Sequence, residues 1–176
     1  DYNARGGLSI TKTLVGASTA PGRFSFTVTA EAGDVLGIAG TYGSPEIADG
    51  GTVTIAATGG DVIFTQNDAG KTWSYTITEN DPGAGYACEC STWNVSVGVE
   101  NDAAAGRLVA TTVVTGGGRS RTWTYASDGE AVPDGAEVAF VNRYAATGST
   151  ADIVGTKELA GRLMNDGEFS FELVDQ

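Results

Sequence analysis

The sequence has no histidine, only two cysteines, and few basic residues. Without histidine the chain lacks the commonest metal ligand and general base, which excludes Ser-His-Asp and Cys-His catalysis. Ten lysines and arginines stand against 22 acidic residues, for a formal net charge of −12. Such acidity argues against nucleic acid, because phosphate contacts need basic surfaces. No apolar run approaches the length of a membrane span, so we expect no membrane insertion.

The two cysteines, Cys88 and Cys90, are too few for a disulfide framework. In an extended strand the Cβ atoms of alternate residues are too far apart for an ordinary bridge, although a strained bridge in a turn stays open. As a metal site the pair lacks two ligands. We interpret them as incidental thiols or a local bridge, in preference to a redox or metal role. We expect no metal and no cofactor.

What the sequence does contain is the pattern of short β-strands. Glycine occurs 26 times, between segments rich in valine, threonine, isoleucine and aromatic residues. Apolar and polar residues alternate most clearly at 93–99, and similar alternation predicts strands at 8–14, 24–28, 53–55, 73–77, 123–125 and 138–144. Turn signals lie between them, at Pro21-Gly22, Asp49-Gly50-Gly51, Asp81-Pro82-Gly83 and Asp128-Gly129. This pattern predicts an all-β, immunoglobulin-like two-sheet sandwich.

The two ends of the chain are similar to each other. Shifted by 145 positions, residues 11–26 align with residues 156–171 without a gap, with eight identities in sixteen positions. This similarity predicts a tandem repeat with a complete domain at 1–145, a small polar linker at 146–150, and the first strands of a truncated second copy at 151–176. Two strands cannot bury a core alone, so the second copy should be frayed, docked on the first, or paired with another copy.

Three polar residues interrupt the inward-facing phase of the predicted strands. Lys12 lies between apolar residues of the first strand, Glu79 continues the apolar phase of a middle strand, and Asn142 lies between two aromatic residues of the last strand. A lone buried charge is costly, so such groups are seldom buried without a partner. The three residues together therefore suggest one cluster.

An amine, an acid and a carboxamide permit a specific reaction. Burial favours the neutral forms of an amine and of a carboxylic acid. The amine of Lys12 can then attack the carboxamide carbon of Asn142, while Glu79 polarises the amide oxygen and passes a proton to the departing ammonia. The product is an amide between two side chains, formed once without turnover. Two other arrangements fit the same phases: a buried Lys12–Glu79 salt bridge with Asn142 hydrogen-bonded nearby, or a surface position for at least one of the three.

These segments resemble the streptococcal pilin isopeptide-linkage domain family. Residues 10–16 with 24–26 are similar to the opening of that domain, residues 73–79 to its central strand ending in the acid, and residues 140–144 to its closing strand. The resemblance covers residues 8–145, and the opening again at 153–173. It implies an immunoglobulin-like domain of surface pilins and adhesins of Gram-positive bacteria.

In that family a lysine and an asparagine join spontaneously with the help of the acid. Carried over to this sequence, the resemblance implies a bond between Lys12 and Asn142, assisted by Glu79. Lys157 matches the lysine of a second domain whose acid and asparagine are not present, so it should form no bond of its own within this chain. The Cys88-Glu89-Cys90 segment departs from the family, and neither a Leu-Pro-x-Thr-Gly sorting signal nor a pilin-polymerisation motif is found. Covalent assembly into a pilus is therefore not supported.

We accordingly expect a non-enzymatic stalk repeat on the cell surface or in the cell wall, with neighbouring repeats of its parent chain as partners. The alternative is an adhesin module that binds a host protein or glycan. Trp73, Trp93 and Trp123 lie on apolar phases, which predicts core positions rather than a binding surface. A hydrolase using Asp81 and Asp102 is disfavoured, because turn and surface positions explain these acids better. Calcium sites at Asn101-Asp102 or Asp128-Gly129 lack EF-hand spacing.

Overall fold

The computed structural model describes residues 4–16, 22–55, 62–126, 136–145, 154–172 and 174. The predicted linker at 146–150 and the Asp128-Gly129 turn, with the calcium site considered there, lie outside the described residues. Inside them, the regular secondary structure is β-strand apart from one short 3-10 turn at Gln66–Asp68. No helix in the described ranges has the length and apolarity needed to cross a membrane.

The larger sheet has six strands, and each neighbouring pair in it is antiparallel. In spatial order the strands are β11 (Arg119–Ala126), β10 (Arg107–Gly116), β9 (Thr92–Asp102), β7 (Thr72–Glu79), β3 (Phe26–Ala32) and β4 (Thr41–Gly43). Alternation of apolar and polar residues explains why these segments are strands, since it lets one face of the sheet be buried. In β9 the buried residues are Trp93, Val95, Val97 and Val99.

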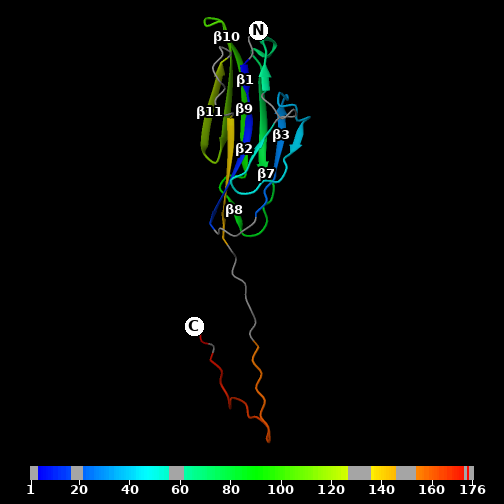
Figure 1. Ribbon diagram of the computed structural model, residues 1–176, viewed down its shortest axis with the longest axis vertical. Helices are drawn as coiled ribbons and strands as arrows, with labels where there is room; N and C mark the ends of the chain where they lie inside the picture. Colours follow the sequence, from blue (N-terminus) through cyan, green and yellow to red (C-terminus); the bar gives the residue numbers. More distant parts are fainter. Residues whose placement is uncertain are drawn as a thin grey trace.

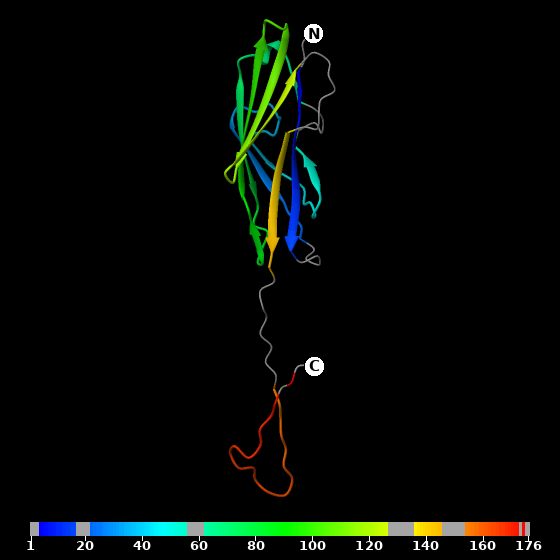
Figure 2. The ribbon, with the colours of Figure 1, turned by 90° about the vertical axis from the view of Figure 1, so that its left-hand side faces the viewer.

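The smaller sheet has four strands, and two further strands form a separate two-stranded ladder. The four strands are, in spatial order, β5 (Thr52–Thr54), β2 (Leu8–Gly16), β12 (Ala136–Tyr144) and β8 (Tyr86–Cys88). The ladder joins β1 (Ala4–Gly6) to β6 (Val62–Phe64). Figure 2 shows the two main sheets from the side, with the green strands of the larger sheet on one side and the blue β2 and gold β12 on the other.

The apolar faces of the two sheets meet in one core. Its fully buried members include Ile10, Phe26, Ile77 and Phe140, each with no measurable exposure. The prediction of an all-β, immunoglobulin-like two-sheet sandwich is therefore confirmed. Of the three tryptophans assigned to the core, Trp73 and Trp93 are buried, while Trp123 is half-buried against the edge of the core.

The first long strand and the last strand are neighbours. β2 and β12 pair in parallel, from Leu8 opposite Ala136 to Gly16 opposite Tyr144. Figure 1 shows the two strands side by side, and Figure 2 shows that they point the same way. Gly16 ends β2 with a φ of +119°, and a Cβ atom there would lie 2.5 Å from the carbonyl oxygen of Tyr144. Only glycine fits this close approach of the two strand ends.

The structure differs from the sequence prediction in its short elements. β1, β4, β6 and β8 have three residues each and were not expected. A segment of that length shows at most one alternation, so periodicity cannot identify it. The strand expected at 24–28 begins instead at Phe26, because the backbone of Phe24 is hydrogen-bonded in both directions to Ile47.

The C-terminal residues 154–172 and 174 contain no strand, and Figure 1 draws them as an extended trace. Their large apolar side chains are exposed, for example 85% for Val154 and 90% for Leu163. Local contacts nevertheless occur, including an ion pair between Arg162 and Glu168. The tandem repeat stays a prediction.

One buried hydroxyl offers a test of the packing. The Tyr75 hydroxyl accepts hydrogen bonds from the backbone N–H groups of Val35, at 2.6 Å, and Leu36, at 3.1 Å. Burial raises the pKa of this phenol, so it stays neutral at ordinary pH. Tyr75→Phe leaves both N–H groups without an acceptor and should lower the free energy of unfolding by about 1–3 kcal/mol. Urea denaturation measures the loss. Tyr42→Phe, which removes the same atom from a half-buried site, is the control, and equal stabilities of the two variants would contradict the assignment.

Candidate functional site

The topology brings the three predicted polar residues to one place. Lys12 in β2 lies opposite Phe140 in β12, and Asn142 is two residues further along the same strand, so both side chains face the core. Glu79 is the last residue of β7, in the facing sheet. The cluster therefore spans the space between the two sheets.

The side chains of Lys12 and Asn142 converge on one carboxylate oxygen of Glu79. Lys12 Nζ lies 2.7 Å from Glu79 Oε1, and Asn142 Nδ2 donates a hydrogen bond of 3.2 Å to the same oxygen. Lys12 is 1% exposed, Glu79 6% and Asn142 0%. The alternative in which one of them faces solvent therefore does not apply. The two remaining alternatives, the buried ion pair and the cross-linking reaction, are both compatible with this geometry. The cross-link itself stays a prediction.

Hydrogen bonding in this cluster is incomplete. Lys12 Nζ, Glu79 Oε2 and Asn142 Oδ1 are buried and have no hydrogen-bond partner among the described residues. Lys12 Nζ is at ion-pair distance from Glu79 Oε1, but the angle of the contact is not that of a hydrogen bond. At this distance the pair is electrostatic. Buried polar atoms without hydrogen-bond partners are costly and uncommon, which makes this cluster the candidate functional site.

Aromatic side chains enclose the cluster. Lys12 Nζ lies 4.3 Å from the centre of the Phe24 ring. Phe24 packs edge-on against Tyr86, which in turn contacts Tyr144. A second ring pair, Phe26 and Phe140, has its centroids 4.7 Å apart. These rings exclude water, which strengthens the electrostatic interactions inside and limits the motion of the reacting groups.

Glu79 faces the amide nitrogen of Asn142 rather than its oxygen. This is the position from which a carboxylic acid can protonate the nitrogen that leaves as ammonia. The sequence reasoning gave Glu79 a second task, polarising the amide oxygen. In this orientation Asn142 Oδ1 faces no hydrogen-bond donor among the described residues.

Lys157, the predicted equivalent of Lys12 in the second copy, is exposed. Its Nζ lies 5.0 Å from the centre of the Phe169 ring. The 145-residue shift that places Lys12 on Lys157 also places Phe24 on Phe169, so in both segments the lysine lies near the equivalent aromatic ring. No acid or asparagine partner of Lys157 occurs in the described part of 154–174 at hydrogen-bond or ion-pair distance.

Sequence reasoning missed two residues of the site. Phe24 lies in the repeated segment, where its identity with Phe169 is a usable signal, but the sequence alone predicts no role for it. Cys88 lies directly opposite Asn142 in the antiparallel pairing of β8 with β12. Burial, and then the neighbouring Glu79 carboxylate, raise the pKa of the Cys88 thiol to about 12. No local pattern reveals Cys88, because its place depends on the unpredicted strand β8.

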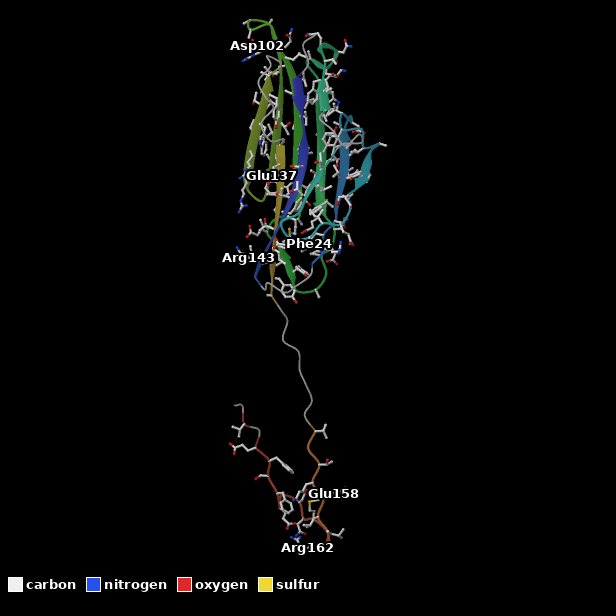
Figure 3. All side chains as sticks on the ribbon, viewed as in Figure 1. Phe24, Asp102, Glu137, Arg143, Glu158 and Arg162 are labelled. Atoms are coloured by element: carbon white, nitrogen blue, oxygen red, sulfur yellow. The ribbon has the colours of Figure 1, made fainter. Side chains whose placement is uncertain are left out.

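The other groups considered from the sequence lie elsewhere. Asp81 accepts a hydrogen bond from Gly83 N and so stabilises a turn, and Asp102 is bonded to the turn that follows β9. Figure 3 places Asp102 at the opposite end of the sandwich from Phe24. Within the described ranges no three Cys, Asp or Glu side chains gather so that they could hold a metal ion.

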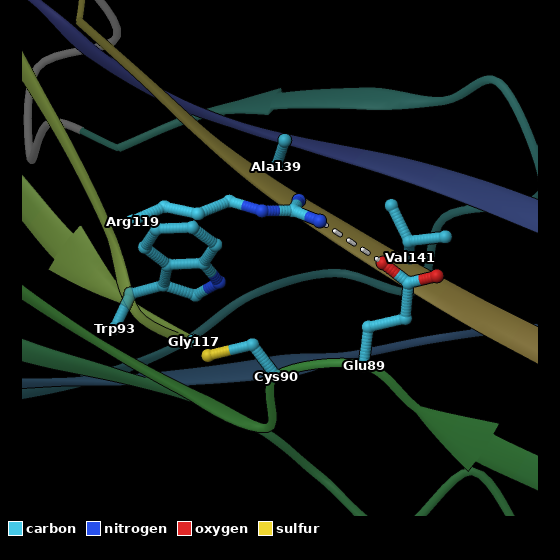
Figure 4. Close-up of a pocket in the computed structure, with 7 residues that line it drawn as sticks. All are labelled: Glu89, Cys90, Trp93, Gly117, Arg119, Ala139 and Val141. Carbon is cyan, nitrogen blue, oxygen red and sulfur yellow. Dashed lines mark ion pairs between the residues drawn. The ribbon is translucent and has the colours of Figure 1, made fainter.

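A shallow surface pocket opens between the edges of the two sheets. Figure 4 shows its lining, in which Arg119 pairs with Glu89 at 3.5 Å beside Trp93. Cys90 also lines it, and its thiol donates to the carbonyl oxygen of Thr92 at 2.9 Å. The pocket holds one acid, one base and one thiol, with no pair of groups arranged for proton transfer.

Comparison with known proteins places these observations in a family. No curated protein matches the chain. Among solved structures, the major pilin protein (T-13) of Streptococcus pyogenes is similar at 17% identity and a TM-score of 0.37, over 79% of this chain and 52% of that one. The chain thus spans about half the length of that pilin. Residues 8–145 match the FctA family, described as the Spy0128-like isopeptide containing domain, and the chain belongs to this family.

Proposed function

We propose that this chain is a structural module of a bacterial surface pilus or adhesin stalk, and that an amide bond between Lys12 and Asn142 locks its sandwich. The observation that carries the proposal is the convergence of the Lys12 amine and the Asn142 amide on one oxygen of Glu79 in a buried site. Membership of a family named for its isopeptide-containing domain supports it.

The reaction begins with transfer of a proton from Lys12 Nζ to Glu79 Oε1 across 2.7 Å. Burial favours this step, because two buried charges become two neutral groups. The free amine then attacks Cγ of Asn142 and forms a tetrahedral intermediate. Because the fold already holds the two groups together, the reaction step avoids the entropy cost of bringing them together.

Glu79 next gives its proton to Nδ2 of Asn142 and receives the surplus proton of the lysine nitrogen. The bond from Cγ to Nδ2 breaks, ammonia leaves, and the amide between Lys12 and Asn142 remains. One carbon–nitrogen bond forms while another breaks, so the reaction needs no oxidant and no cofactor. Glu79 ends protonated. The process happens once per molecule, and the module is therefore not an enzyme.

The position of the bond explains its use in a stalk. Lys12 lies on the first long strand and Asn142 on the last, and these strands are paired in parallel. Tension applied to the two chain ends reaches the bond before it reaches the strands between them. A module of this kind suits the outer surface of a Gram-positive bacterium, where shear and proteases act. Its partners would be neighbouring repeats of the parent chain.

The proposal predicts the mass of the intact protein. Loss of one ammonia should make the wild-type chain about 17 Da lighter than its sequence requires. Lys12→Ala, Asn142→Ala and Glu79→Ala proteins should have their full sequence masses, because each lacks one participant. Mass spectrometry of the intact, denatured proteins makes the measurement, and digestion should yield one peptide pair joined through Lys12 and Asn142.

Lys71→Ala serves as the matched control. The Lys71 side chain is 54% exposed and pairs with Asp68 at the surface, so its removal should leave the 17 Da loss unchanged. A wild-type protein of full sequence mass would end the cross-link proposal and leave the buried ion pair.

The alternative of a module that binds a host protein or glycan has weaker support. Trp73 and Trp93 belong to the core, and Trp123 is half-buried, so the residues best suited to stack on a sugar are mostly enclosed. The pocket beside Arg119 is the place to look for such a ligand. A glycan and matrix-protein binding screen distinguishes the two functions.

A further inference from the structure

Cys88 is held firmly at the edge of the reaction site. β8 pairs with the end of β12, so that Cys88 is opposite Asn142 and Tyr86 opposite Tyr144. Glu89 N donates to the carbonyl oxygen of Val141 at 2.9 Å, and the Glu89 carboxylate pairs with Arg143 at 2.9 Å. These contacts fix the backbone on both sides of Cys88. A short edge strand would otherwise be free to move.

The side chain of Cys88 points to the same interior as Asn142, because directly opposite residues of an antiparallel pair share a face. It packs against the buried core and is half-buried itself. The nearby Glu79 carboxylate acts on the thiol strongly enough to help raise its pKa to about 12, after burial as the larger cause. The thiol therefore keeps its hydrogen at ordinary pH and can donate it to a neighbouring acceptor.

One oxygen of Glu79 has no hydrogen-bond donor. Glu79 Oε1 is already shared by Lys12 and Asn142, whereas Glu79 Oε2 is buried and has no hydrogen-bond partner among the described residues. The Glu79 carboxylate acts on the Cys88 thiol, and Oε2 is the oxygen of that carboxylate that still has no donor.

We propose that Cys88 is a positioning residue for the cross-linking reaction: its thiol hydrogen serves Glu79 Oε2, so that Glu79 Oε1 stays turned toward Lys12 and Asn142. The inference rests on the proposed function and assigns a role within the same site. Cys90 has no such role, because its thiol is bonded to the carbonyl oxygen of Thr92 and lies in the surface pocket of Figure 4.

The rate of bond formation tests the proposal. The chain is made by cell-free synthesis, samples are quenched in acidic denaturant, and the cross-linked fraction is read from the 17 Da lower mass. Cys88→Ser keeps a donor and should cross-link at the wild-type rate. Cys88→Ala and Cys88→Val, one smaller and one of similar bulk, lack the donor and should be slower by about three- to tenfold. Cys90→Ala, the matched control, should match the wild type.

A second measurement does not depend on the cross-link. In Asn142→Ala, Cys90→Ala protein, which cannot form the bond and has one thiol, Cys88 should react slowly with iodoacetamide at pH 8. Adding Glu79→Gln removes the neighbouring charge and should speed alkylation several-fold. Equal alkylation rates, or equal cross-linking rates for Cys88→Ala, Cys88→Ser and the wild type, would overturn the role of Cys88. Absence of the 17 Da loss in the wild type would instead remove the reaction itself.

Discussion

Pulled from its two ends, the wild-type protein should extend only by the residues outside the segment from Lys12 to Asn142. The Asn142→Ala protein should extend further, by the contour length of 130 residues, or about 43–47 nm. The reason is topological. β2 and β12 lie side by side and point the same way, so pulling loads the two strands in shear. In the wild type a covalent bond between them carries that load.

Single-molecule force spectroscopy, with handles at both termini, makes this measurement. Lys71→Ala is the control, because it removes a lysine that pairs at the surface with Asp68 and should behave as the wild type does. Unfolding of the wild-type domain to the full extension of the Asn142→Ala protein would show that no covalent bond joins the two strands.

The second large effect concerns stability, where two single substitutions should differ. Asn142→Ala loses the cross-link but keeps the ion pair of Lys12 and Glu79. By analogy with a disulfide that closes a loop of this length, the loss is about 4–5 kcal/mol, or about 10–20 °C in melting temperature. Lys12→Ala loses the cross-link and also leaves the Glu79 carboxylate buried without a cation. Removing one partner of a buried pair adds about 3–5 kcal/mol.

The combined loss in Lys12→Ala is comparable to the whole stability of an ordinary domain. We therefore expect this variant to melt well below Asn142→Ala in calorimetry, and the double variant Lys12→Ala, Glu79→Ala to recover part of the difference. Equal melting temperatures for the two single variants would contradict a buried, functional Glu79.

Much of the site follows from strand periodicity. Lys12, Glu79 and Asn142 each stand where the alternation calls for an apolar side chain, and the structure buries all three. Periodicity also predicts the two-sheet architecture, because a long strand such as β9 must bury one face. These are local properties of the chain, so they can be recognised without knowing which strands are neighbours.

Which residues come into contact with one another depends on the tertiary structure. Phe24 leaves its expected strand, bonds to Ile47 and lies beside the Lys12 amine, a contact that the alternation within strands does not predict. β8 is too short to show a period, yet its register with β12 sets Cys88 opposite Asn142. The choice of the amide nitrogen as the atom facing Glu79 is likewise decided by packing.

The sequence by itself determined that the chain is an all-β sandwich and which three polar residues turn inward, because a period of two assigns each side chain to a face. Only the tertiary structure decided that these residues converge on a single oxygen of Glu79, and that a thiol adjoins it. The physical reason is that strand pairing and register are set by contacts between distant segments, such as the paired residues of β2 and β12, which are 128 positions apart. Alternation within a strand carries no information about which strand lies beside it.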